Sequence, residues 1–146
     1  MGKTAAKVLL DTLVMHGIDR AFCVPGESYL AVMSELHDDP VLHLVTCRHE
    51  GGAAFMALAD AKLTGQVGVV FASRGPGATN ASVAAHSAEQ GAQPLLLLLG
   101  QVSTRRLGRK ATQEMDFTKT FGDIAKSVEE VHDPNRIAEI VARAIR

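Results

Sequence analysis

Short apolar runs alternate with longer segments of helical spacing along the chain. The apolar runs are bounded by glycine, proline or polar residues and predict buried strands; they cover residues 20–24, 41–45, 66–72 and 95–99. Apolar residues at helical spacing predict helices over residues 4–17, 28–37, 50–65 and 133–145 and in a segment that ends at residue 90. A short helix at 113–121 and a fifth strand at 124–131 complete the pattern.

This order of elements predicts an α/β fold. Strands that alternate with helices form a parallel sheet covered on both faces, so we expect a three-layer αβα domain with a mostly parallel sheet of about five to six strands. Residues 1–146 are expected to form one domain. The leucine run 95–99 shows no alternation, which predicts a central strand, whereas the charges of 124–131 place that strand near an edge.

One predicted helix carries a stripe of mostly small side chains. The stripe consists of Ala53, Ala54, Ala57, Leu58 and Ala61. Small side chains let another backbone approach closely. Two interpretations remain open, packing on the chain's own sheet and contact with another subunit.

Composition excludes several classes of function. The formal net charge is −1, with 15 basic and 16 acidic residues, and aromatic residues make up 4% of the chain, so a nucleic-acid surface is not expected. The longest apolar run, 95–99, is too short to span a membrane, and we expect a cytoplasmic protein. Cys23 and Cys47 have no second cysteine or histidine at ligand spacing, and Ala53 stands where a zincin would place its second histidine, so no metal site is predicted.

Glu50 is the first candidate for chemistry. It follows the apolar run 41–45 and opens the alanine-rich helix, so it lies at a strand-to-helix turn. In a parallel α/β sheet such turns lie at the carboxyl ends of the strands, where ligands bind. A glutamate that only stabilises the helix dipole is the alternative.

Two polar segments at the same predicted edge allow further interpretations. The glycine-rich turn 73–80 resembles half of a dinucleotide fingerprint, but Asn80 replaces the third glycine, so we do not expect dinucleotide binding. The basic segment 100–112 is expected to form a mobile surface loop, with a lid or an anion-binding loop as the alternative.

Five motifs together resemble a known family in order and spacing. They are Val24-Pro25-Gly26, Arg48-His49-Glu50-Gly51-Gly52-Ala53, Gly75-Pro76-Gly77-Ala78-Thr79-Asn80, Gly100-Gln101-Val102 and Gln113-Glu114. The combination resembles the N-terminal pyrimidine-binding domain of thiamine diphosphate enzymes, in the acetolactate synthase-like branch. The resemblance covers essentially the whole chain.

The resemblance implies a part of a 2-oxo acid decarboxylase or carboligase. By it, Glu50 is a catalytic residue that hydrogen-bonds a pyrimidine ring nitrogen and favours the imino tautomer, whose nitrogen removes the thiazolium C2 proton. Gln113 matches a glutamine near the reacting centre. The cofactor-binding residues that the resemblance implies are Pro25, Gly26, Glu50, Pro76 and Asn80.

Two departures from the family pattern bear on the substrate. Glu27 replaces the small residue that commonly follows Pro-Gly, so the pocket shape or the substrate preference is expected to differ. The adjacent His-His pair that is typical of pyruvate decarboxylases is absent from the sequence. The resemblance implies a small 2-oxo acid as substrate.

The other half of the implied site is missing from this chain. Family enzymes hold the diphosphate and its Mg²⁺ through Gly-Asp-Gly in a second domain, and here Gly122-Asp123-Ile124 is the nearest approach. The resemblance therefore implies a diphosphate-binding domain or subunit as partner, a site at a dimer interface, and a homodimer or tetramer in the complete enzyme. It leaves FAD binding open.

Three interpretations of the whole protein follow. The chain is the first domain of a longer three-domain enzyme, which its end just after a helix favours, or it is a separately encoded pyrimidine subunit of a two-subunit decarboxylase. The third interpretation is a non-catalytic binding module that keeps the fold. Under the first two we expect the isolated chain to be inactive.

Overall fold

The centre of the molecule is a parallel sheet of four strands. The computed structural model describes residues 2–37 and 39–146. The strands are β1 (Arg20–Cys23), β2 (His43–Thr46), β3 (Gly68–Ala72) and β4 (Leu95–Leu99), and their order in the sheet is β2-β1-β3-β4. Every neighbouring pair is parallel, so all four strands end at the same edge.

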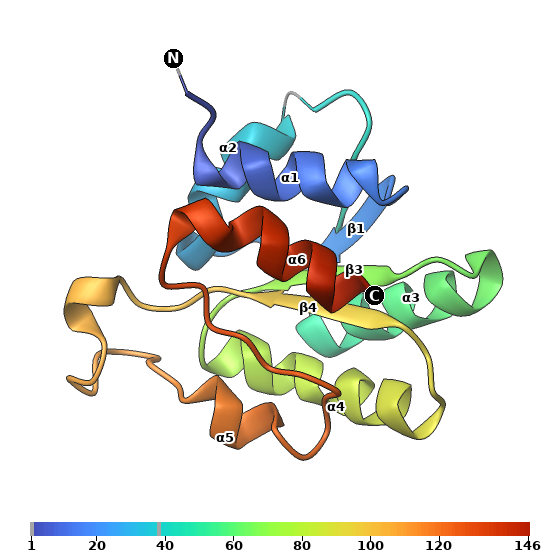
Figure 1. The fold of residues 1–146 in the computed structure, drawn as a ribbon. Coiled ribbons are helices and arrows are strands. Elements are labelled where there is room, and N and C mark those ends of the chain that lie inside the picture. Colours follow the sequence, from blue (N-terminus) through green and yellow to red (C-terminus); the bar gives the residue numbers. More distant parts are fainter. Residues whose placement is uncertain (1, 38) are drawn as a thin grey trace.

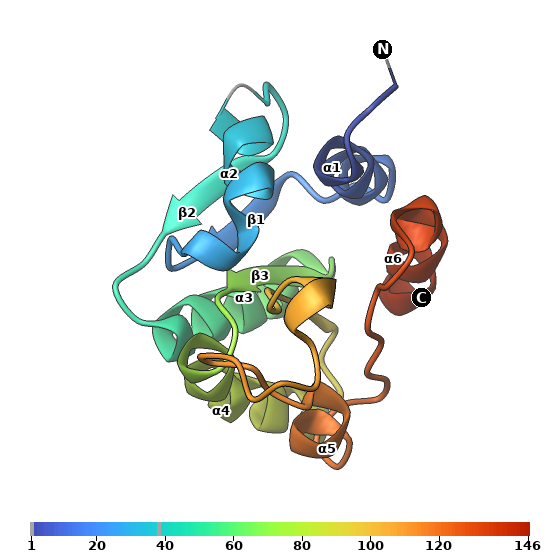
Figure 2. The same cartoon turned by 90° about the vertical axis from the view of Figure 1, so that its left-hand side faces the viewer.

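Helices cover both faces of this sheet and make three layers. The helices are α1 (Ala5–Met15), α2 (Leu30–His37), α3 (Glu50–Thr64), α4 (Pro76–Gln90), α5 (Phe117–Phe121) and α6 (Ile137–Ile145). Helices α1, α2 and α6 lie on one face, and α3, α4 and α5 lie on the other (Figures 1 and 2). The predicted αβα class is therefore confirmed.

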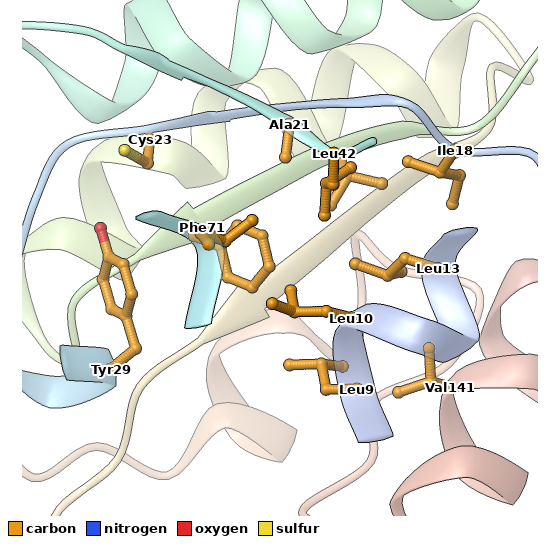
Figure 3. Packing of buried hydrophobic residues seen from close by; sticks show 12 residues of the cluster. Leu9, Leu10, Leu13, Ile18, Ala21, Cys23, Tyr29, Leu42, Phe71 and Val141 are labelled. Carbon is orange, nitrogen blue, oxygen red and sulfur yellow. The ribbon is translucent and has the colours of Figure 1, made fainter. Parts of the chain in front are cut away.

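Alternate residues of each strand pack into separate cores on the two faces. Phe71 and Leu42 contact Leu10 and Leu13 in the larger core, which faces α1 and α6 (Figure 3). Val70, the neighbour of Phe71, packs against the alanines of α3 and α4 instead. This division is what side chains that alternate across a strand produce when both faces are covered.

The small-residue stripe packs on the chain's own sheet. All five stripe residues are buried in the core that faces α3 and α4 or beside it. The helix comes so close that a Cβ atom at Gly68 of β3 would lie 2.2 Å from the carbonyl oxygen of Ala57. Of the two interpretations left open, the structure therefore supports packing against the sheet for this stripe.

Two strand predictions are wrong. Residues 124–131 contain no strand, because the half-buried Ile124 and Val128 pack instead against Phe117 and Phe121 of α5. The sheet thus has four strands, below the predicted five to six. Strand β4 lies at the edge of the sheet instead of its centre. An unbroken apolar run indicates that both faces of a strand are covered, but it does not indicate that the strand has a neighbour on each side.

Helix boundaries agree more closely with the sequence patterns. Thr4 caps α1 by accepting a hydrogen bond from the Lys7 amide at 3.0 Å, and Gly65 ends α3 in the left-handed conformation, with φ of +75°. The helix predicted over 113–121 is shorter, because α5 begins only at Phe117. Among the described residues, none of the helices is both long and apolar enough to cross a membrane.

Candidate functional site

The candidate site lies at the edge of the sheet where the four strands end. Cys23 pairs with Thr46 of β2 and with Phe71 of β3, and Ala72 pairs with Leu99 of β4. The connections after these strands therefore leave the sheet side by side. This is the edge at which ligands bind in parallel α/β sheets.

Glu50 is the first residue of α3 and is half-buried. His49 caps the helix, with Nδ1 accepting a hydrogen bond from the Gly51 amide at 3.1 Å. One carboxylate oxygen of Glu50, Oε2, accepts a hydrogen bond from Asn80 Nδ2 at 2.9 Å. This bond joins the start of α3 to the second turn of α4, through two residues that lie thirty positions apart in the sequence.

Glycines leave a narrow space around the other carboxylate oxygen. A Cβ atom at Gly77 would lie 3.1 Å from Glu50 Oε1 and 3.3 Å from the Ser73 Cβ, and one at Gly26 would lie 1.7 Å from the Ser73 Oγ. The turn after β1 and the connection from β3 to α4 thus meet at Ser73, and Gly77 also lies against Glu50. Within residues 2–37 and 39–146, Asn80 is the residue that hydrogen-bonds the Glu50 carboxylate, so Oε1 remains an open acceptor.

Gln113 lies in the loop before α5 and is held against the start of α4. Its φ is +64°, which is uncommon for a residue other than glycine. Gly75 has a φ of +58°, and a Cβ atom there would lie 2.9 Å from both the Cβ and the carbonyl oxygen of Gln113. Only glycine fits this conformation and this contact, so Gly75 fixes the backbone of Gln113 beside the turn that leads to Asn80.

The loop before Gln113 is organised around the carboxylate of Glu114. That carboxylate accepts hydrogen bonds from the backbone amides of Gly108 and Ala111, the second at 2.8 Å. These bonds favour the charged form and lower the pKa of Glu114 from its ordinary value. The loop is therefore tied to the residue that follows Gln113.

Tyr29 supports the turn that contains Pro25 and Gly26. Its hydroxyl donates a hydrogen bond to the carbonyl oxygen of Val24, and its ring stacks on Phe71 with centroids 5.9 Å apart. Burial raises the pKa of the Tyr29 phenol, and the nearby Cys23 and Glu50 add to the shift. The phenol therefore keeps its proton and its bond to the turn.

The structure brings some of the predicted site residues into contact and places the others on turns at the same edge. Glu50 and Asn80 are in direct contact, Gly26 joins them through Ser73, and Gln113 joins through Gly75. Pro25 and Pro76 lie on the turns at the same edge and are exposed.

Three interactions at the candidate site were not predicted from the sequence. Ser73 stands between two glycines, Glu114 holds its loop, and the Arg74 guanidinium pairs with Glu27 at 3.0 Å. Glu114 stands in a quoted motif, and Ser73 and Arg74 directly precede another, which is the one signal that points to them.

Both cysteines are free thiols. Cys23 is fully buried at the end of β1, and burial raises the pKa of its thiol. Cys47 is half-buried, with its sulfur 3.7 Å from the Met56 sulfur. The described part of the chain contains no group of three or more histidine, cysteine, aspartate or glutamate side chains that could hold a metal ion.

The residues present suit one part of an aminopyrimidine cofactor and not its diphosphate. A carboxylate with an open acceptor oxygen fits a ring nitrogen of a pyrimidine. Cavities of about 370 Å³ and 230 Å³ lie elsewhere, between α2 and β2 and beside the basic loop, and neither includes Glu50 or Asn80. The site is thus an open sheet edge that needs a second surface to enclose a ligand.

The fold and this edge define a cofactor-binding domain of the parallel α/β class, and comparison with known families identifies which one. Residues 3–120 match the family described as thiamine pyrophosphate enzyme, N-terminal TPP binding domain. The chain belongs to this family, and thiamine pyrophosphate is another name for thiamine diphosphate. The recognised resemblance to thiamine diphosphate enzymes is therefore confirmed.

Comparison with individual relatives agrees with this family. The chain is 38% identical over 145 residues to the acetolactate synthase large subunit of Pyropia yezoensis, which covers 97% of this chain and 25% of the relative. It is 36% identical over 141 residues to acetolactate synthase of Bacillus subtilis, covering 97% of this chain and 25% of the relative. It is 32% identical over 146 residues to sulfoacetaldehyde acetyltransferase of Rhodobacter capsulatus, covering 100% of this chain and 25% of the relative. The chain thus spans about a quarter of the length of these relatives.

Proposed function

We propose that this chain is the cofactor-activating domain of a thiamine diphosphate-dependent 2-oxo acid decarboxylase or carboligase of the acetolactate synthase-like kind. The observation that carries the proposal is the Glu50–Asn80 hydrogen bond, which holds one carboxylate oxygen and leaves the other open beside Gly77. When bound, thiamine diphosphate would supply a thiazolium ring that accepts the electrons released on decarboxylation.

Each side chain at the edge has a part in this proposal. Glu50 Oε1 shares a proton with a pyrimidine ring nitrogen, which is the proton transfer that activates the cofactor. Asn80 restricts the rotation of the carboxylate, so that Oε1 keeps its direction. Gly26 and Gly77 let the backbone pack closely on Ser73 and Glu50. In this proposal Pro25, Gly26 and Pro76 border the ring, and Gln113 positions the substrate.

The second half of the site comes from a partner surface. We assign the diphosphate and Mg²⁺ to a diphosphate-binding domain or subunit that covers the open edge. Helices α3 and α4 expose the large apolar side chains of Phe55, Met56, Leu63 and Val83, and exposed apolar groups can mark contact surfaces. A homodimer or tetramer in which this face is buried would complete the site.

The names of the relatives support the substrate class and the chemistry. They are an acetolactate synthase and a sulfoacetaldehyde acetyltransferase, whose names denote the formation of acetolactate and the transfer of an acetyl group. A small 2-oxo acid is the donor that we propose here. The two free cysteines favour a reducing compartment such as the cytoplasm.

The proposal is tested by replacing Glu50 with glutamine in the complete enzyme, in which this domain is combined with its diphosphate-binding partner. Glutamine keeps the size of the side chain but cannot take up the shared proton. Consumption of the 2-oxo acid should fall about 100-fold or more. Glu89→Gln, on the exposed end of α4, is the matched control and should leave the rate unchanged. Equal activity of Glu50→Gln and the unmodified enzyme would favour a non-catalytic binding module.

A further inference from the structure

Two arginines line a cavity next to the candidate cofactor site. The cavity has a volume of about 230 Å³ and is lined by Arg74, Val102, Ser103, Arg106, Ala111 and Thr112. It is smaller than the roughly 300–1,000 Å³ of pockets for drug-sized ligands. It therefore suits a single charged group or a small organic acid.

Arg74 is held in a fixed position at this cavity. Its side chain is only 19% exposed. One terminal nitrogen pairs with Glu27 Oε1 at 3.0 Å, and Nε donates to the Thr112 carbonyl oxygen at 3.5 Å. A guanidinium has five N–H donors, so these two contacts leave others for a ligand.

Arg106 adds a second guanidinium that has no carboxylate partner. It ends the short turn Thr104–Arg106, and among the described residues no aspartate or glutamate forms an ion pair with it. The carboxylate of Glu114, in the same loop, accepts hydrogen bonds from two backbone amides and forms no ion pair with Arg106. The cavity is therefore lined by two guanidinium groups, and among the described residues only that of Arg74 is paired with a carboxylate.

We propose that this cavity binds a small oxyanion, a phosphate, sulfonate or carboxylate group of a small molecule, between Arg74 and Arg106. Guanidinium groups bind such oxyanions through paired, charge-assisted hydrogen bonds. Ser103 and Thr112 add a hydroxyl group each at the cavity wall. This site is separate from the pyrimidine-binding residues, and anion binding does not depend on thiamine diphosphate.

Glu27 is a built-in competitor for the anion. Its exposed carboxylate pairs with one terminal nitrogen of the Arg74 guanidinium. Removal of the Glu27 charge should free that nitrogen for the ligand. The sequence showed Glu27 as a departure from the small residue that commonly follows Pro-Gly, and the structure connects this departure with the Arg74 cavity.

The site lies next to the reacting centre that we propose. Arg74 directly follows Ser73, and Thr112 directly precedes Gln113. An anion in the cavity would therefore lie beside the residues that surround Glu50. If the proposed function is correct, this is where an acidic group of the substrate or acceptor would bind; the binding measurement below is independent of that step.

Titration of the isotopically labelled chain with inorganic phosphate, sulfate and oxalate tests the site by NMR. Saturable shifts are expected at the backbone amides of Ser103, Ala111 and Thr112, and the anion that binds most tightly identifies the chemical class. Arg106→Gln should weaken binding about fivefold or more, and Arg106→Lys should weaken it less. Glu27→Gln should strengthen binding.

Arg105→Gln is the matched control, because Arg105 lies in the same turn but does not line the cavity. It should weaken binding less than about twofold. Equal weakening by Arg105→Gln and Arg106→Gln would show a diffuse charge effect and overturn the proposal, as would the absence of saturable shifts with all three anions. A far-UV circular dichroism spectrum of each variant confirms that it is folded.

Discussion

Asn80 and Glu50 act as a pair across two helix starts. The amide fixes one carboxylate oxygen at 2.9 Å, and the glycine at position 77 keeps the space beside the other oxygen clear. A carboxylate in this position would rotate freely without Asn80. The hydrogen bond therefore fixes the orientation of the Glu50 carboxylate. A proton transfer to a ring nitrogen needs such a fixed orientation.

Asn80→Ala tests this positioning role in the complete enzyme. We expect kcat/KM to fall about tenfold, because a hydrogen bond to a charged group contributes about 1.5 kcal/mol or more. Steady-state kinetics measures the change. Asn135→Ala, at the exposed turn before α6, is the control and should not alter kcat/KM. An unchanged value for Asn80→Ala would show that Glu50 needs no support from the amide.

The sequence predicted these residues but not the contacts that join them. Glu50 and Asn80 stand in motifs that can be recognised by residue type and spacing. Ser73 touches the turn at Gly26 only because Gly26 has no side chain there, and this closeness depends on β1 and β3 ending side by side. Spacing along one chain does not contain that information.

The stability of the folded chain depends on pH through the hydrogen bonds that the Asp39 carboxylate accepts. Its carboxylate accepts bonds from the backbone amides of Leu42 at 2.9 Å and Val41 at 3.0 Å and pairs with Lys7, and its side chain is 3% exposed. These contacts lower the pKa of Asp39 below its ordinary value of 3.8, with the Leu42 amide as the largest cause. Its stabilising effect is therefore complete above that value and is lost as the pH falls through the lowered pKa.

Asp39→Asn should lower the free energy of unfolding by about 1–3 kcal/mol at pH 7. The difference from the unmodified chain should shrink as the pH falls below about 4, since protonation then removes the same charge. Urea unfolding at several pH values measures both effects. Asp123→Asn, at an exposed position, is the control. A difference that stays constant down to pH 2 would contradict this role.

At the scale of elements, the contact between α3 and β3 determines how the site is built. The small side chains of α3 let its backbone lie directly on Gly68, and this contact brings Glu50 to the end of the sheet. The sequence predicted the four strands and the main helices because their apolar spacing is regular. It failed at 124–131 and in the order of the strands, because helix packing and strand pairing produce the same apolar runs.

Gly68→Ala tests the close packing of helix and strand. The new Cβ atom would lie 2.2 Å from the Ala57 carbonyl oxygen, so the helix must shift, and the free energy of unfolding should fall by about 1–3 kcal/mol. Gly52→Ala is the matched control on the exposed side of α3, where nothing lies within 4 Å. It should raise the free energy by about 0.5–1 kcal/mol, since alanine favours a helix. Chemical unfolding compares the two, and a neutral Gly68→Ala would contradict the packing.

At the scale of the whole molecule, the candidate site is an open edge. The chain spans about a quarter of the length of its relatives, and neither the cavity between α2 and β2 nor the cavity beside the basic loop includes Glu50. Helices α3 and α4 also expose large apolar side chains. These features agree with a domain that works only against a second surface.

The isolated chain should therefore release no carbon dioxide from pyruvate above background, even with thiamine diphosphate and Mg²⁺. Activity should appear when the diphosphate-binding domain or subunit is added. A coupled assay of carbon dioxide release measures both conditions. Turnover by the pure chain alone would contradict the proposal that the site is shared.

Exchange of the thiazolium C2 proton for deuterium is the most direct test of the role of Glu50. It is measured by NMR after acid quenching, in the complete enzyme with bound thiamine diphosphate, and it does not require knowledge of the substrate. We predict that Glu50→Gln slows the exchange about 100-fold or more, while Glu89→Gln leaves it unchanged. Equal exchange rates in Glu50→Gln and the unmodified enzyme, both with the cofactor bound, would contradict the central claim that Glu50 activates the cofactor.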